Sequence, residues 1–298
     1  MAIFLNVVLP VLLVFFTGYL VQLWKKIDIK PISTAAIYIM TPTLVFRTFY
    51  TAEINVQYLY MIIFCCMLLF ALIIINKIYS KIRKYPTDLE SGLILSTAFM
   101  NSGNYGAPII LFAYGEAGFV YAIIFMVLQA MIMNFFGVYY AAKGRAGIRT
   151  SLKMVFKMPA TYALLVAVFI RVFDLSLPGN LFMTIDIIAE ATIPTVMIIL
   201  GMQLAKIKWG NFEWGKVSYG VFVRLIISPI IAWGITLLLP LDPLLTKVVI
   251  VLAATPSAAT IVMYAIEFNS KPRLVSSITL ISTLLSIITI TLLLAILG

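Results

Sequence analysis

Two apolar stretches of the sequence contain residues that cannot continue a regular helix. The first reads Asn-Ser-Gly-Asn-Tyr-Gly-Ala-Pro at residues 101–108, and the second reads Ala-Thr-Pro-Ser-Ala-Ala-Thr at residues 254–260. Gly and Pro carry large helix penalties, and Pro108 and Pro256 also lack the N–H that a helix needs. In hydrocarbon, unsatisfied backbone groups are costly, so an unwound stretch must face protein or a wet cavity. We expect two interrupted membrane helices; the alternative is a pair of proline-kinked helices repaired by neighbouring Ser and Thr side chains.

The chemistry that such interruptions offer is anion binding. The second half of a broken helix begins with free N–H groups and a positive dipole end, here near residues 105–107 and near Ser257. Such ends bind anions without a charged side chain. Neither stretch contains an acidic residue, so the site suits a carboxylate better than a cation. The candidate substrate-binding residues are Asn101, Ser102, Asn104, Tyr105, Pro108, Thr255, Pro256, Ser257 and Thr260.

Asp186 and Glu190 stand four residues apart on one helical face, a turn before Pro194. Ionisable residues inside a membrane are a functional hypothesis by default, and burial favours the neutral carboxyl. The hypothesis is that these two acids carry coupling protons. The alternative is that both lie near the outer interface, solvated or paired with Arg171 or Lys247.

Two arginines also fall within apolar segments. Arg224 lies too deep for easy solvation, and we expect it to pair with an acid or to extend toward the cytoplasmic interface. Arg47 follows Pro42 near the outer end of its segment, and we expect its side chain to reach the interface.

The composition requires a membrane setting for these residues. Of 298 residues, 63% are hydrophobic and 11% are charged, whereas soluble domains carry about 45–50% apolar and about 25% charged residues. The chain has no histidine, and its two cysteines, Cys65 and Cys66, are adjacent. Histidine catalysis, a four-ligand metal site and a disulfide framework are therefore excluded, and no phosphate-binding Gly-x-x-x-x-Gly-Lys motif is present. We expect a polytopic transporter rather than an enzyme, with no cofactor and no bound metal.

Ten apolar segments are long enough to span a bilayer. Most basic residues fall in the odd-numbered loops between them, so the positive-inside rule makes those loops cytoplasmic and both termini extracytoplasmic in the plasma membrane. The net charge of +10 thus reflects topology and not nucleic-acid binding. The predicted spans are 2–23, 33–50, 57–76, 89–112, 117–140, 159–173, 179–204, 216–238, 244–266 and 275–297.

Ten spans divide into five plus five, and an odd number per half inverts the second half. Pro42 and Pro194 are 152 residues apart in equivalent spans, and Pro108 and Pro256 are 148 apart. Paired interruptions in inverted halves indicate a transporter binding site. We therefore expect an all-α protein with a first five-helix repeat at 1–141, a short basic cytoplasmic loop at 142–158 and an inverted repeat at 159–298.

These features resemble the auxin efflux carrier family over essentially the whole chain, in its bacterial form. The resemblance rests on residues 101–108, on Ile193-Pro194 followed by Leu200-Gly201, on residues 253–257 and on Ser-Thr-Leu-Leu-Ser at 282–286. It implies two inverted five-helix repeats, a scaffold domain and a transport domain in which broken spans four and nine cross. It also implies a substrate carboxylate near Asn101, Asn104, Pro108 and Pro256.

Two departures from the family pattern matter. The central loop is short, unlike that of the plant members, and the second interrupted stretch has no asparagine. More distantly, the chain is similar to the sodium–bile acid symporters, although the acid of their sodium sites is missing at the crossing. The family often forms homodimers, but no residue here indicates one.

The leading hypothesis is therefore a secondary carrier for small organic anions such as malate, malonate or auxin-like acids, coupled to protons and working by alternating access. The alternative is a sodium-coupled organic acid symporter. A channel would need a polar stripe along several helices, whereas polarity here concentrates at one depth.

Overall fold

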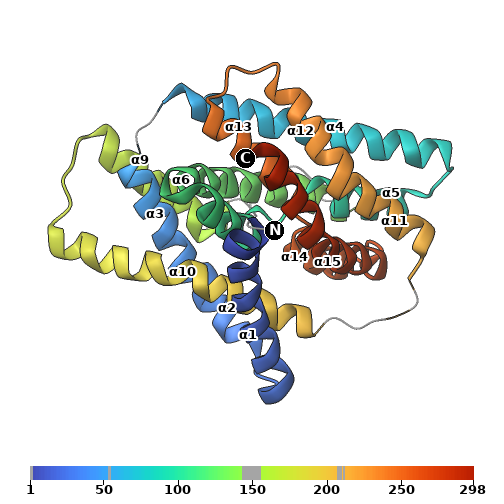
Figure 1. Cartoon of the computed structure of the whole chain (residues 1–298), viewed down its shortest axis with the longest axis horizontal. Helices are drawn as coiled ribbons and strands as arrows, with labels where there is room; N and C mark the ends of the chain where they lie inside the picture. The colour runs from blue at the N-terminus through green and yellow to red at the C-terminus, as the bar shows by residue number, and fades with distance from the viewer. Residues whose placement is uncertain (1–2, 53–54, 143–155, 207–209, 211) are drawn as a thin grey trace.

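The computed structural model describes residues 3–52, 55–142, 156–206, 210 and 212–298, and its regular elements there are all helical (Figure 1). Most of the predicted 142–158 loop lies outside these residues. The α-helices are α1 Leu9–Lys25, α2 Ile29–Ala35, α3 Thr41–Thr51, α4 Val56–Ile82, α5 Thr87–Ala98, α6 Ala107–Ile132, α7 Val138–Ala141, α9 Pro159–Val172, α10 Gly179–Ala205, α11 Trp214–Phe222, α12 Ser228–Thr236, α13 Pro243–Ala253, α14 Ala259–Glu267 and α15 Pro272–Leu297.

Membrane-spanning length is reached by seven helical stretches within the described residues, and α9 and α13 are shorter apolar helices. The longest stretch, Ser102–Ala141, is divided at Gly115, whose φ of 65° and ψ of −164° only glycine adopts readily. The predicted all-helical, polytopic class is confirmed. The count of ten spans and the inverted repeat stay predictions.

Wide, π-helical turns join several of these helices into longer ones. Proline explains most of these turns, because it cannot donate to the carbonyl four residues earlier and its ring clashes with that carbonyl. A wider turn relieves both problems. Four such turns end two residues before a proline: Phe4–Val8 (η1), Ala36–Met40 (η2), Ser102–Gly106 (η3) and Val223–Ile227 (η5), ahead of Pro10, Pro42, Pro108 and Pro229. The fifth, Met133–Gly137 (η4), has no such proline.

The helices pack as two groups. One contains α1, α2, α3, α9 and α10, with α10 lying along both α1 and α3 (Figure 1). The other contains α4, α5 and α11–α15, on the far side of α6 in Figure 1. The first turns of α6, including η3, contact α10 on one side and α13 on the other, so this segment lies where the groups meet.

The closest helix contact in the first group depends on two glycines. Gly18 of α1 lies against the backbone of Ile198, and Gly201 of α10 lies against the backbone of Phe15. A Cβ at Gly201 would stand 1.8 Å from the Phe15 carbonyl oxygen, and one at Gly18 would stand 2.2 Å from that of Ile198. Small residues of this kind allow membrane helices to approach backbone to backbone.

We expect Gly201→Ala to force α1 and α10 apart and to destabilise the protein by about 1–3 kcal/mol, the usual cost of overpacking. The measurement is the melting temperature of the purified protein in detergent. The control is Gly234→Ala in α12, where a Cβ meets nothing within 4 Å and helix propensity favours alanine. Equal melting temperatures for the two variants would contradict this packing.

Candidate functional site

The two interrupted stretches meet. After α5 ends at Ala98 the backbone is extended, and after α13 ends at Ala253 it turns before it meets that segment. The two segments form one antiparallel bridge, with Met100 opposite Ser257. The Asn101 N–H donates to the Pro256 carbonyl at 2.8 Å, and the Ala258 N–H donates to the Phe99 carbonyl at 3.1 Å. The crossing therefore satisfies its own backbone groups, as an unwound segment at membrane depth must.

Side chains near the second interruption close the carbonyl ends of the two half-helices. The Thr255 hydroxyl donates to the Leu252 carbonyl at 2.7 Å, and the Ser257 hydroxyl donates to the Ser96 carbonyl. Thr255 and Ser257 are both fully buried. They belong to the crossing, as predicted, but their hydroxyl protons are committed to the backbone.

Arg224 bonds a backbone carbonyl at the end of each of the two half-helices. Its guanidinium donates to the Thr97 carbonyl at 2.7 Å, to the Ala253 carbonyl and to the Ser228 hydroxyl at 2.7 Å. The side chain is 0% exposed and has no acidic partner in the described part of the chain. Our expectation that Arg224 pairs with an acid or extends toward the interface was wrong, because two helix ends supply the negative partner.

The amino-terminal end of η3 remains open, whereas that of α14 is partly closed. The Ser257 N–H donates to the Ser282 hydroxyl at 3.3 Å and the Ala258 N–H donates to the Phe99 carbonyl, so the N–H group that we expected to be free at Ser257 is already bonded. The first intrahelical bond of η3 runs from Gly106 N–H to the Asn101 carbonyl at 3.0 Å, so the N–H groups of residues 102–105 have no acceptor within their helix. Asn104 and Thr260 are half-buried, and Asn101 is 7% exposed. No described residue hydrogen-bonds the side-chain amides of Asn101 and Asn104.

The other predicted site residues serve the packing around these ends. The Tyr105 hydroxyl accepts from Ser286 at 2.8 Å, and its ring packs against Phe15 at 5.6 Å between centroids. Pro108 is buried in the first turn of α6, and Pro256 supplies the carbonyl that holds Asn101. Ser102 is buried at the start of η3.

A cavity of about 290 Å³ opens beside this segment, between α6 and the group containing α1, α3 and α10. The cavity wall begins at Leu111. Asn104, Pro108 and Leu111 follow one another at intervals of four and three residues, which places them on one stripe of the helix. Most of the lining is apolar. The charged lining residues are Arg47, Glu116 and Glu190.

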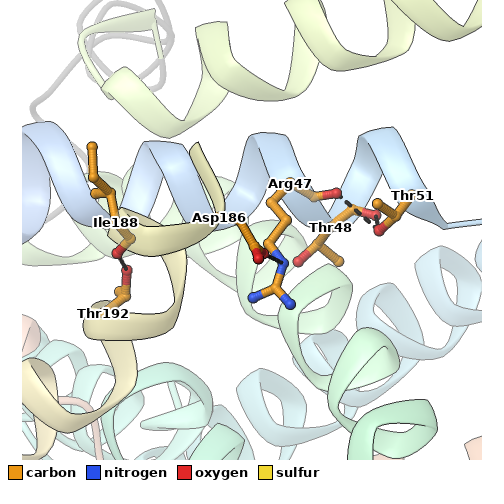
Figure 2. A network of polar contacts seen from close by, with 6 residues as sticks. All are labelled: Arg47, Thr48, Thr51, Asp186, Ile188 and Thr192. Atoms are coloured by element: carbon orange, nitrogen blue, oxygen red, sulfur yellow. Dashed lines mark hydrogen bonds and ion pairs between the residues drawn. The ribbon is translucent and has the colours of Figure 1, made fainter. Parts of the chain in front are cut away.

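The predicted proton-coupling acids lie on the cavity side of α10. Figure 2 shows the Arg47 and Asp186 side chains pointing at one another between α3 and α10, with Arg47 Nε 2.8 Å from Asp186 Oδ1. The two cations named in the alternative for these acids have other partners: Arg171 donates to the Tyr50 carbonyl, and Lys247 to the Gly298 carbonyl. Glu190 is exposed and forms no ion pair with any described residue.

The structure thus pairs the backbones of the two interrupted stretches. It places Glu190 on the lining of the cavity, and Asp186 in an ion pair with the lining residue Arg47. The sequence interpretation missed the bonds of Arg224. The signal that was present is an arginine in an apolar run with Ser228 four residues later, at helical spacing for the bond between them.

Comparison with known proteins agrees with this architecture. Residues 3–294 match the membrane transport protein family, which is the auxin efflux carrier family. An uncharacterized transporter of Methanothermobacter thermautotrophicus is 28% identical over 295 residues, covering 95% of each chain. An uncharacterized transporter of Methanocaldococcus jannaschii is 27% identical over 303 residues, covering 97% of each chain. The family and both relatives are transporters and not enzymes, and the chain, a multi-pass membrane protein, belongs to this membrane transport protein family.

Proposed function

We propose that the protein is a secondary carrier of small organic anions that holds the substrate carboxylate at the crossing. The observation that supports this most directly is the open amino-terminal end of η3, beside the side-chain amides of Asn101 and Asn104, which no described residue bonds. Free N–H groups and the positive dipole end attract an anion. Because neither interrupted stretch contains an acid, nothing at the crossing repels a carboxylate.

The chain crosses the membrane ten times in this proposal. Span four consists of α5 and the helix up to Gly115, span five runs from Glu116 to α7, and span nine consists of α13 and α14. The two halves are inverted repeats, and their equivalent interruptions meet by antiparallel pairing. Both termini then lie outside the plasma membrane.

The group with α1, α3, α9 and α10 is the proposed scaffold, and the group with the crossing is the proposed transport domain. The cavity lies between the scaffold group and α6, the helix that follows η3 of the crossing. A site carried by one group that faces the other can be opened to either side of the membrane by rocking one group against the other.

Charge at the cavity favours proton coupling. Arg47 is balanced by Asp186, and the lining acids Glu116 and Glu190 form no ion pair with any residue that the structure describes. Two carboxylates would repel an approaching organic anion, and protonation of Glu190 would remove part of that repulsion. Since Asp186 is held by Arg47, Glu190 is the better proton carrier of the two.

Uptake of radiolabelled malate into proteoliposomes, under pH, sodium and voltage gradients in turn, tests the function. A proton gradient that drives uptake without sodium supports the proposal. Uptake that requires sodium supports the symporter alternative. If none of the three gradients drives uptake, malate is not a substrate, and malonate and indole-3-acetate are the next probes.

We expect Asn104→Ala to reduce malate uptake about tenfold or more, because a hydrogen bond to a charged group contributes about 1.5–3 kcal/mol. Expression and melting temperature stay at wild-type values, since the amide has no partner in the fold. The matched control is Asn180→Ala at the exposed start of α10, which leaves uptake unchanged. Wild-type kinetics for Asn104→Ala would rule out this position as a ligand.

We expect Glu190→Gln to abolish the dependence of uptake on a pH gradient while substrate exchange continues. The glutamine keeps the size of the side chain but cannot take up or release a proton. The control is Glu267→Gln, an exposed acid at the end of α14 away from the cavity. Uptake by Glu190→Gln that still follows the pH gradient would clear Glu190 of the coupling role.

A further inference from the structure

Arg224 stands at the one point where the carbonyl ends of both interrupted helices converge. It lies in η5, between α11 and α12, and is the largest fully buried side chain in the described part of the protein. Its guanidinium reaches the Thr97 carbonyl in the last turn of α5 and the Ala253 carbonyl at the end of α13. The Ser228 hydroxyl, one turn along, donates to the same Ala253 carbonyl at 2.8 Å.

The negative charge of the two helix ends and the positive charge of the guanidinium nearly cancel. Each helix carries about half a negative charge at its carbonyl end, so two converging ends present about one negative charge. The guanidinium supplies one positive charge that no described acid neutralises. A buried charge without compensation is strongly unfavourable, so the helix ends and the arginine stabilise one another.

Carbonyl ends of broken helices are where transporters of inverted-repeat architecture coordinate a sodium ion or a proton. In this protein the carbonyls already have a cation, and that cation is covalently part of the chain. An inorganic cation at the same place would find the Thr97 and Ala253 carbonyls already bonded, and the guanidinium would repel it.

We propose that the Arg224 guanidinium acts as a tethered cation that replaces an inorganic coupling ion at the crossing. It balances the carbonyl ends of α5 and α13 permanently, and the amino-terminal end of η3 stays uncompensated. The crossing then carries a net positive potential without sodium, which selects an anion. The anionic substrate class rests on the proposed function, whereas the replacement of an ion does not.

The test uses full-length protein with Arg224→Ala, with Arg224→Lys, and with Arg171→Ala as the matched control. Arg171 also donates to the carbonyl of a helical residue, Tyr50 of α3, but away from the crossing. Melting temperatures are measured in choline, sodium and guanidinium chloride at equal ionic strength, and malate uptake is measured in the same salts.

We expect wild type and Arg171→Ala to show the same melting temperature and uptake in choline and in sodium. Arg224→Ala loses about tenfold or more of its uptake in choline, and about 5 °C or more of melting temperature. Low concentrations of guanidinium or sodium restore part of both losses, because these cations bind the vacated carbonyls. A purely structural arginine would produce the losses without a cation-specific recovery.

Three results would overturn the proposal. One is sodium dependence of the wild type, and another is Arg224→Ala with wild-type uptake and stability in choline. The third is a stable Arg224→Lys protein that is inactive or needs sodium, since lysine keeps the charge; this variant decides the matter if Arg224→Ala does not fold. If wild type transports no malate, the proposed substrate fails, and the melting temperatures still decide the role of Arg224.

Discussion

The need to satisfy backbone polar groups at membrane depth governs this structure. Two helices are interrupted in the same region, which frees N–H and carbonyl groups where no bulk water is available. The protein meets this need asymmetrically. The extended segments pair with one another, hydroxyls and a guanidinium occupy the carbonyl ends, and the amino-terminal end of η3 keeps free N–H groups. At the crossing, the open helix end therefore offers hydrogen-bond donors, which are what an anion requires.

Proline has a second effect that spreads beyond the crossing. Pro108 and Pro229 each follow a wide turn by two residues, and these turns hold Asn104 and Arg224 respectively. Asn104 and Arg224, which are proposed to act on the two sides of the crossing, therefore both lie in turns that a proline has widened. π-Helical turns recur at functional sites because the extra residue redirects neighbouring side chains.

Sequence reasoning located the interruptions because Gly, Pro and Asn concentrate there, and helix propensity is a local property. It predicted the meeting of the two stretches only through the repeat argument and the family resemblance. It did not predict the bonds of Arg224, whose carbonyl partners lie 127 and 29 residues away and are invisible in a sequence, since every residue has a carbonyl. The Arg47–Asp186 pair was missed because the partner of an acid depends on which helices pack side by side, and sequence spacing does not reveal that.

In the proposed carrier, substrate binding and proton coupling are placed on different groups. At the crossing the potential is set by helix ends and one fixed guanidinium. At the cavity it is set by Arg47, Glu116 and Glu190, of which Glu190 is the proposed proton carrier. Recognition of an anion at the crossing therefore does not depend on the state of the coupling group. Placing the two functions on α10 and on the crossing lets each change state while the other is held by its own contacts.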